Sequence, residues 1–124
     1  MVAQLGRSRP AVLLAAVEHQ LGEYHAGLRR TFDLPLALDG TEFQCSVWRA
    51  LCEIPYGETR SYGQVAQRIA RPRAVRAVGL ANGANRIAII VPCHRVVNTG
   101  GALGGYSSGL ERKRYLLELE RRSG

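Results

Sequence analysis

The sequence predicts a mainly α-helical fold with a small β component, built around a helix-turn-helix or winged-helix-like unit. Apolar residues recur every three or four positions in several segments, as on the buried face of a helix. Two of these segments begin with capping-box pairs, Thr41 with Gln44 and Ser61 with Gln64. A short, mostly β-branched run at 87–91 is the candidate strand. A chain of 124 residues suffices for one compact domain with its own core.

The first forty residues are predicted to form a helix followed by an extended connector or short edge strand. Across residues 10–28 the apolar positions lie three and four apart, with charged residues between them: Leu14, Val17, Leu21, Tyr24 and Leu28. Residues 32–38 cannot continue this helix, because Pro35 lacks a backbone donor and its ring clashes with the preceding turn. We therefore expect residues 1–40 to be an extension on a domain formed by residues 41–124.

Residues 41–83 contain three predicted helices, of which the second and third form the helix-turn-helix. The first begins at the Thr41 capping box and ends at Pro55, and the second begins at the Ser61 capping box. The second helix must stop before Pro72, which we expect to open the third helix at its first turn. Two short helices joined by a tight turn are typical of DNA-binding units.

The third predicted helix has one apolar face and one basic face. In projection at roughly 100° per residue, four small or apolar residues share a face: Ala74, Val75, Val78 and Ala81. Arg73, Arg76 and Leu80 point the opposite way. The arginine face is therefore free to meet DNA.

Cys93 lies just beyond the candidate strand and is followed by a histidine and an arginine. The run 87–91 predicts a buried strand that Pro92 ends, so the thiol is expected to be held rigidly there. Free cysteine has a pKa of about 8.5, and only its thiolate is a nucleophile. Basic neighbours favour the thiolate and make Cys93 a candidate nucleophile. The alternative is a small buried packing residue, which is how we interpret Cys45 and Cys52.

The last part of the chain predicts a glycine-rich loop and a final helix. Residues 100–109 contain five glycines, which favours a flexible loop of the kind that closes on ligands. Ser108 with Glu111 makes a third capping box. The apolar stripe of the final helix consists of Leu110, Leu116 and Leu117. Glu120 lies within this stripe in projection, so we expect its carboxylate to point inward.

The chain is strongly basic, with a net charge of +7 and an isoelectric point near 10.0. Arginines cluster at 71–76, and further basic residues near the end are Arg112, Lys113, Arg114, Arg121 and Arg122. This balance suits a polyanionic partner such as DNA, although a basic surface alone is the alternative.

Cysteine usage and hydropathy indicate the compartment. Three cysteines without paired spacing indicate reducing conditions. The sequence shows no signal-like segment and no apolar stretch of membrane-spanning length. We expect an intracellular monomer, cytoplasmic in a prokaryote or nuclear in a eukaryote, that uses no cofactor, metal or membrane.

Several separated motifs, in the same order, resemble the O6-alkylguanine-DNA alkyltransferase family, which repairs alkylated guanine. The motifs are Arg76-Ala77-Val78-Gly79, Asn85, Pro92-Cys93-His94-Arg95-Val96 and Gly104-Gly105-Tyr106-Ser107. The resemblance covers about residues 41–120 and implies a winged-helix-like alkyltransferase domain. Family members usually carry a further amino-terminal β-rich domain, of which residues 1–40 are expected to be a remnant. Arg86 departs from the proline that the family commonly has after the asparagine.

The resemblance implies catalytic roles for five residues. Cys93 is the nucleophile and alkyl acceptor, and His94 takes its proton through a bound water. Glu120 orients the histidine and stabilises its cation. Tyr62 supplies a donor to a ring nitrogen of the leaving guanine, and Asn85 ties the recognition helix to the active-site strand. A stable thioether at Cys93 implies that each molecule reacts once.

The resemblance also implies how the substrate is bound. The partner is double-stranded DNA containing O6-alkylguanine, with O4-alkylthymine as a second substrate, and the damaged nucleotide is flipped out through the minor groove. The base-binding residues are Tyr106, Ser107 and Val96. The DNA-binding residues are Arg76, which takes the place of the flipped base, with Arg73, Ala77, Arg71 and Ser61.

Two other functions are compatible with parts of the sequence. Related alkyltransferase-like proteins bind alkylated DNA without reacting, but they lack the reactive cysteine that Cys93 supplies here. A cysteine hydrolase would need a separated histidine and an oxyanion hole, and the other histidines are His19 and His25, both on the first predicted helix.

Overall fold

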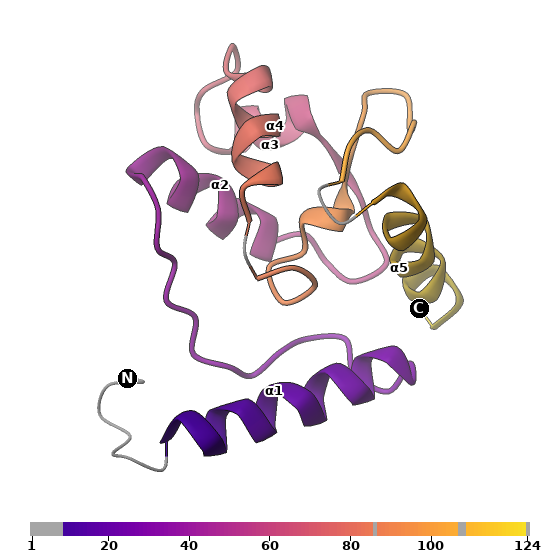
Figure 1. Cartoon of the computed structure of the whole chain (residues 1–124). Helices are drawn as coiled ribbons and strands as arrows, with labels where there is room; N and C mark the ends of the chain where they lie inside the picture. Colours follow the sequence, from indigo (N-terminus) through magenta and orange to yellow (C-terminus); the bar gives the residue numbers. More distant parts are fainter. Residues whose placement is uncertain (1–8, 86, 107–108, 124) are drawn as a thin grey trace. The chain divides into compact units, whose positions relative to one another are not determined.

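The computed structural model describes residues 9–85, 87–106 and 109–123, and confirms the mainly α-helical fold class (Figure 1). The chain divides into two compact units, one up to Ala37 and the other from Leu38 to Arg122. Of the helices in the described ranges, none combines the length and apolar character needed to cross a membrane.

The first unit contains the helix α1, Arg9–His25, and the connector after it. The helix predicted across 10–28 is confirmed, although it ends three residues earlier than expected. The connector is irregular and includes no strand within residues 26–37. Gln20 anchors it to the helix, because its side-chain amide bonds to the backbone oxygen and nitrogen of Asp33 at 3.1 and 2.9 Å. The ring of Tyr24 also packs against Phe32, with centroids 5.6 Å apart.

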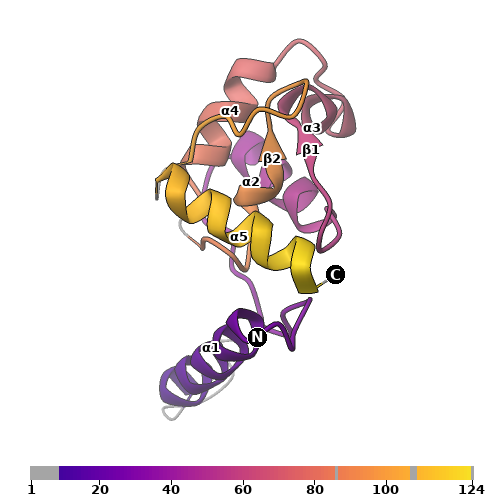
Figure 2. The same cartoon turned by 90° about the vertical axis from the view of Figure 1, so that its right-hand side faces the viewer.

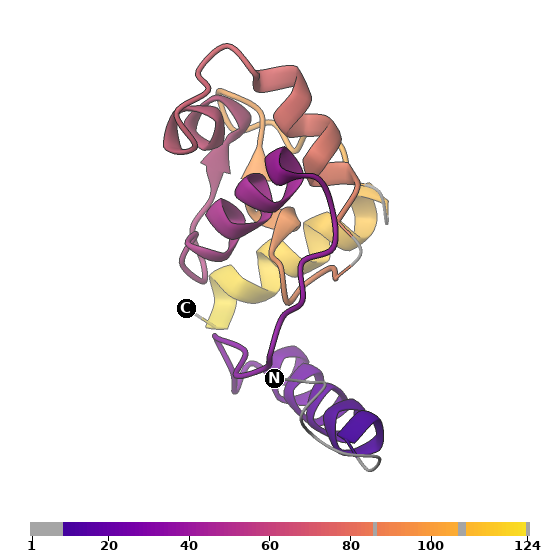
Figure 3. The ribbon, with the colours of Figure 1, turned by 90° about the vertical axis from the view of Figure 1, so that its left-hand side faces the viewer.

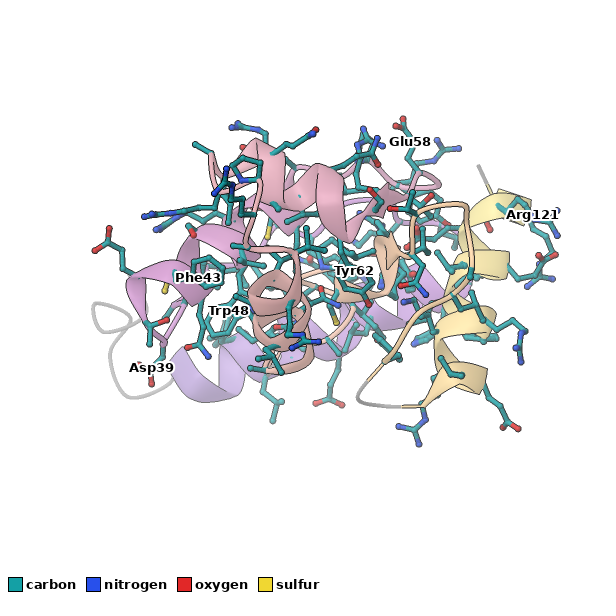
Figure 4. The ribbon with its side chains drawn as sticks, turned by 90° about the horizontal axis from the view of Figure 1, so that it is seen from above. Asp39, Phe43, Trp48, Glu58, Tyr62 and Arg121 are labelled. Atoms are coloured by element: carbon teal, nitrogen blue, oxygen red, sulfur yellow. The ribbon has the colours of Figure 1, made fainter. Side chains whose placement is uncertain are left out.

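In the second unit, three short helices pack together: α2, Glu42–Cys52; α3, Tyr62–Arg68; and α4, Val75–Gly83 (Figures 1 and 3). Both capping boxes are confirmed, and each includes both reciprocal hydrogen bonds. The indole nitrogen of Trp48, labelled in Figure 4, donates to the Ala81 carbonyl at 2.9 Å and ties α2 to α4. The buried core includes Val47, Leu51, Val65, Ala66, Val78, Val91, Cys93 and Val96.

The prediction that Pro72 opens the third helix was wrong. The Ala74 nitrogen donates to the Arg71 carbonyl at 2.9 Å, which makes residues 71–74 a turn with Pro72 at its second position. The helix α4 starts only at Val75. Val75 itself is 41% exposed. The buried face of α4 therefore begins at Val78 rather than at Val75.

The prediction of a strand at 87–91 was also wrong. The Val91 nitrogen donates to the Ile87 carbonyl at 2.9 Å across a turn in which Ile89 has a φ of 74°. An isolated bridge joins Ala88 to Val91. The β-branched run therefore folds back on itself, although Val91 is buried as expected.

The β component is a two-stranded parallel sheet next to this turn (Figure 2). Strand β1, Arg60–Ser61, pairs with β2, Val96–Val97, in the register Arg60 with Val96. Between the turn and β2, residues Cys93–Arg95 form the 3₁₀ helix η2. The sheet therefore places the start of α3 beside the end of η2.

The final helix α5, Leu110–Ser123, presents a mixed rather than an apolar inner face. Its buried residues are Lys113, Leu116, Leu119 and Glu120. Glu120 points inward as predicted, but Leu110 is 46% exposed and lies outside the buried face. The third capping box involves Ser108, which lies outside the described residues, as does Arg86.

Candidate active site

Cys93 opens η2 and is almost completely buried. Its backbone nitrogen donates to the Val91 carbonyl at 2.8 Å, which fixes the start of this turn. Cys93 and His94 therefore share one tight helical turn. Burial and the neighbouring Cys93 raise the pKa of Tyr106, so a polar side chain lies near the thiol.

His94 is fully buried and pairs with Glu120. Its Nε2 lies 2.6 Å from Glu120 Oε2. Its Nδ1 is buried and has no hydrogen-bond partner among the described residues. A carboxylate that accepts several charge-assisted bonds stays ionised, so Nε2 carries the hydrogen and Nδ1 is left as the acceptor. The ring is thus arranged to take a proton at Nδ1.

The environment of His94 also keeps its imidazole neutral. Burial lowers the pKa of His94 below the ordinary value of about 6.5, although the hydrogen bond and charge of Glu120 oppose this shift. The nearby cations of Arg95 and Lys113 lower that pKa further. A neutral histidine can act as a base at neutral pH.

Arg95 has a role that the sequence did not reveal. It was expected to favour the thiolate, but its guanidinium binds Glu120 through Nε at 2.9 Å and Nη2 at 2.9 Å. Its Nη1 donates to the Ile54 carbonyl at 2.8 Å, and the guanidinium lies over the Tyr56 ring. The Gly57 nitrogen also donates to Glu120 Oε1 at 3.1 Å. The Glu120 carboxylate therefore accepts hydrogen bonds from Arg95 and Gly57 in addition to its bond with His94.

Tyr62 and the glycine-rich segment border the thiol. The Tyr62 hydroxyl donates to the Gly105 carbonyl at 3.5 Å, and Figure 4 shows Tyr62 towards the middle of the unit. Gly104 has a φ of 69°, and a Cβ there would lie 3.1 Å from the Tyr62 ring and hydroxyl. Burial raises the pKa of both Tyr62 and Tyr106, which keeps these hydroxyls protonated. Ser107 lies outside the described residues.

Two asparagines join α4 to the Cys93 turn. Asn85 donates from Nδ2 to the Val91 carbonyl at 2.9 Å and accepts from the Ile87 nitrogen at 3.0 Å. Buried Asn82 donates to the Cys93 carbonyl at 3.3 Å. Asn82 was not singled out from the sequence; its position four residues after Val78, on the apolar face of the predicted helix, was the available signal.

Most of the predicted DNA-binding residues are exposed. Arg71, Arg73, Arg76 and Ala77 are exposed, and Leu80 beside them is 73% exposed. Ser61, the fifth predicted DNA-binding residue, uses its hydroxyl as a helix cap. The side chain of Val96, one of the predicted base-binding residues, is fully buried. Within the described ranges, no three His, Cys, Asp or Glu side chains are grouped to hold a metal ion.

A family model described as "6-O-methylguanine DNA methyltransferase, DNA binding domain" matches residues 42–122. The chain belongs to this family. It is 62% identical over 104 residues to a Methanosarcina mazei protein named methylated-DNA--protein-cysteine methyltransferase, covering 84% of this chain and 66% of that protein. A protein of the same name from Mycolicibacterium paratuberculosis is 61% identical over 113 residues, covering 91% and 68%. The chain thus spans about two thirds of the length of these curated relatives.

Solved structures bound to DNA share this fold. Mycobacterium tuberculosis OGT in complex with DNA has a TM-score of 0.87 and 57% identity, covering 89% of this chain and 68% of that chain. S. pombe Atl1 in complex with damaged DNA containing O6-carboxymethylguanine has a TM-score of 0.59 and 36% identity, covering 67% and 79%. The expected family and fold class are therefore confirmed.

Proposed function

We propose that this protein repairs DNA by transferring an alkyl group from O6-alkylguanine to Cys93, once per molecule. The observation that carries the proposal is the buried Cys93 thiol in the same tight turn as His94, whose ring pairs with Glu120 of α5. The relatives named methylated-DNA--protein-cysteine methyltransferase support it. O4-alkylthymine is the second substrate under the same chemistry.

The reaction is a displacement at the alkyl carbon. The Cys93 sulfur forms the new C–S bond while the bond from that carbon to O6 breaks, and the electron pair leaves with the guanine. The thiol proton passes through a water molecule to His94 Nδ1, and Glu120 stabilises the resulting cation. The Tyr62 hydroxyl gives a proton to a ring nitrogen of the guanine and regains one from the histidine. The net result is alkylated sulfur and a neutral guanine.

The exposed surface of α4 is the proposed DNA contact. Arg71 and Arg73 bind phosphates, and Arg76 takes the place of the flipped nucleotide in the stack. The small side chain of Ala77 lets the helix approach the minor groove closely. Asn85 transmits the position of α4 to the Cys93 turn, since it bonds to both ends of the intervening segment. The proposed DNA contacts also include Ser61. The proposed contacts to the flipped base are those of Val96, Tyr106 and Ser107.

We assign this function to residues 41–124. The reaction takes place in the compartment that contains the DNA, which is the cytoplasm of a prokaryotic cell or the nucleus of a eukaryotic one. The relatives named above are archaeal and bacterial.

The test is to mix the protein with duplex DNA containing O6-methylguanine and to measure the intact protein mass and the repaired guanine. We expect one methyl group on the protein, located on Cys93 by peptide mapping, and none in Cys93→Ala. Cys52→Ala is the matched control, because it removes an exposed thiol of the same unit. Binding to methylated DNA without any transfer would instead favour the damage-recognition function of the Atl1 type.

A further inference from the structure

A fully buried lysine lies beside the site, and the reaction described above makes no use of it. Lys113 is on α5, and its neighbours Arg112 and Arg114 are exposed. Lysine is almost never fully buried unless its ammonium group is satisfied by partners. From the sequence it was counted among the surface cations, so its burial is a finding of the structure.

The ammonium group of Lys113 bonds to three backbone carbonyls. Its Nζ donates to the carbonyl of Val96 at 2.6 Å, to that of Gly105 at 3.0 Å, and to that of Leu103. An ammonium has three donors and no acceptor, so this arrangement uses all of them. Burial lowers the pKa of Lys113 to about 8, while a Cys93 thiolate opposes this shift. The amine is thus still mostly protonated at neutral pH.

These carbonyls belong to two different segments of the chain. Val96 begins β2 directly after η2, whereas Leu103 and Gly105 lie in the glycine-rich segment that leads to Tyr106. The Lys113 nitrogen also lies 6.0 Å from the centre of the Tyr62 ring. One cation therefore connects the turn that carries the thiol to the segment that carries Tyr106.

The glycine-rich segment has few side chains of its own that could hold it in place. Gly100, Gly101 and Gly104 all have φ between 69° and 94°, and a glycine backbone loses more entropy on ordering than any other. Side chains that could anchor it are few, since Leu103 and Tyr106 are the only large apolar ones among its described residues 100–106. Backbone bonds to Asn98 and the bond from Tyr62 to Gly105 hold parts of it, and a charged donor to the carbonyls of Leu103 and Gly105 adds a further restraint.

We propose that Lys113 is a positioning residue for alkyl transfer: it fixes the segment 103–106 over Cys93 and so sets where the base and the Tyr106 hydroxyl lie. This inference rests on the proposed function of the same site. Lys113 does not touch the reacting atoms in this account, and it acts through the backbone of Leu103 and Gly105.

The test compares Lys113→Met with two matched variants. Arg114→Met removes a positive charge from the exposed neighbouring position, and Leu116→Ala weakens the buried face of α5 without removing a bond to the carbonyls of the segment. The measurements are the single-turnover methyl-transfer rate at saturating methylated duplex and the hydrogen exchange of the amides at 103–106.

We expect Lys113→Met to lower the saturating rate at least tenfold and to speed exchange at 103–106 at least tenfold. Arg114→Met should stay within twofold of the unsubstituted protein in both measurements. Leu116→Ala should lower the melting temperature without a selective change at 103–106. A merely structural lysine would lower the melting temperature and leave the saturating rate of the folded protein unchanged, and that result overturns the proposal.

Two further measurements keep the outcome decisive. If Lys113→Met does not fold, Lys113→Gln keeps two donors in an uncharged side chain, and an unchanged saturating rate in that variant would also overturn the proposal. If the unsubstituted protein accepts no methyl group, the alkyl-transfer function fails by itself. Hydrogen exchange in the Lys113 variants then still decides whether the lysine holds the segment.

Discussion

Arginine and lysine occupy two contrasting regions of the second unit, one exposed and one buried. On and before α4, Arg71, Arg73 and Arg76 point into solvent. Around η2, Arg95 and Lys113 are buried, and every donor that the structure records for them ends on a carboxylate or a backbone carbonyl. The same residue types are left available in the first region and fully engaged in the second.

The contrast separates two kinds of electrostatic contribution. Exposed cations interact weakly with the rest of the protein and are screened by salt, so they are suited to a polyanion that displaces counterions. A buried charge that loses its partner is strongly destabilising, because nothing replaces the lost hydration. We therefore expect substitutions in the exposed region to change DNA binding, and substitutions in the buried region to change both stability and chemistry.

The largest effect is expected from Glu120→Gln. An amide cannot balance the charge of Arg95 or stabilise a protonated His94, so we expect a stability loss of about 3–5 kcal/mol and at least a hundredfold slower methyl transfer. Denaturant unfolding and single-turnover rates measure these effects. Glu118→Gln is the control, since Glu118 pairs with Arg121 at the surface of the same helix, and should change stability by less than about 1 kcal/mol. Equal effects of the two variants would remove the distinction between the regions.

A second large effect should follow from Arg76→Ala, and it should be confined to DNA. We expect methyl transfer from a duplex to slow at least tenfold, because the flipped nucleotide leaves a gap that nothing fills. The melting temperature should be unchanged, since Arg76 is exposed. Arg68→Ala serves as the control, because that arginine of α3 is also exposed but pairs with Glu53. A lower melting temperature of Arg76→Ala would contradict this expectation, because it would show that Arg76 stabilises the fold as the buried cations do.

Salt dependence extends this comparison with a smaller effect. Replacing Arg71 or Arg73 by Gln should make the plot of log affinity against log salt concentration shallower by about one unit for each phosphate that the protein no longer neutralises. Titrations of labelled duplex at several salt concentrations measure that slope. An unchanged slope in both variants would mean that neither arginine binds phosphate.

The pH dependence should report the buried region. Burial lowers the pKa of His94. At pH values just below about 6.5, the native state therefore binds fewer protons than the unfolded state. Stability from this residue is therefore present above that pH and is lost as the pH falls towards the lowered value. Methyl transfer should keep its rate below pH 6.5 for the same reason, since the ring stays neutral. Rates and melting temperatures across this range provide the measurement, and a loss of rate already above pH 6.5 would contradict it.

The smallest effect is expected from Asn82→Ala. It removes one hydrogen bond of 3.3 Å to the Cys93 carbonyl, so we expect the free energy of unfolding to fall by about 1 kcal/mol and methyl transfer to slow several-fold. Gly83, next to it, is exposed, and a methyl group added there would meet no heavy atom within 4 Å, so Gly83→Ala is the control for changes in α4. A larger effect in the control would show that the helix rather than the amide is responsible.

Local patterns predicted what local contacts determine. The capping boxes at Thr41 and Ser61 are short-range hydrogen bonds, so residue type and spacing were sufficient to locate two helix starts. Glu120 was predicted to point inward from its place in an apolar stripe. The motif around Cys93 located the site itself, because family resemblance does not depend on knowing the local fold.

Features set by distant contacts could not be read from the sequence. The run at 87–91 has β propensity, but Asn85 and the bond between Val91 and Ile87 fold it into a turn. Pro72 fits the first turn of a helix and the second position of a β-turn equally well, and only the surrounding packing decides. Lys113 resembles a surface cation until the carbonyls of residues far from it in sequence are known.

The central claim is that Cys93 accepts one alkyl group and is not regenerated. Titrating the protein with an excess of duplex containing O6-methylguanine, and following both repaired guanine and methylated protein, tests this claim most directly. We predict that repair stops at one guanine per chain with the methyl group on Cys93. Continued turnover, or methylation of Cys45 or Cys52 instead, would contradict it.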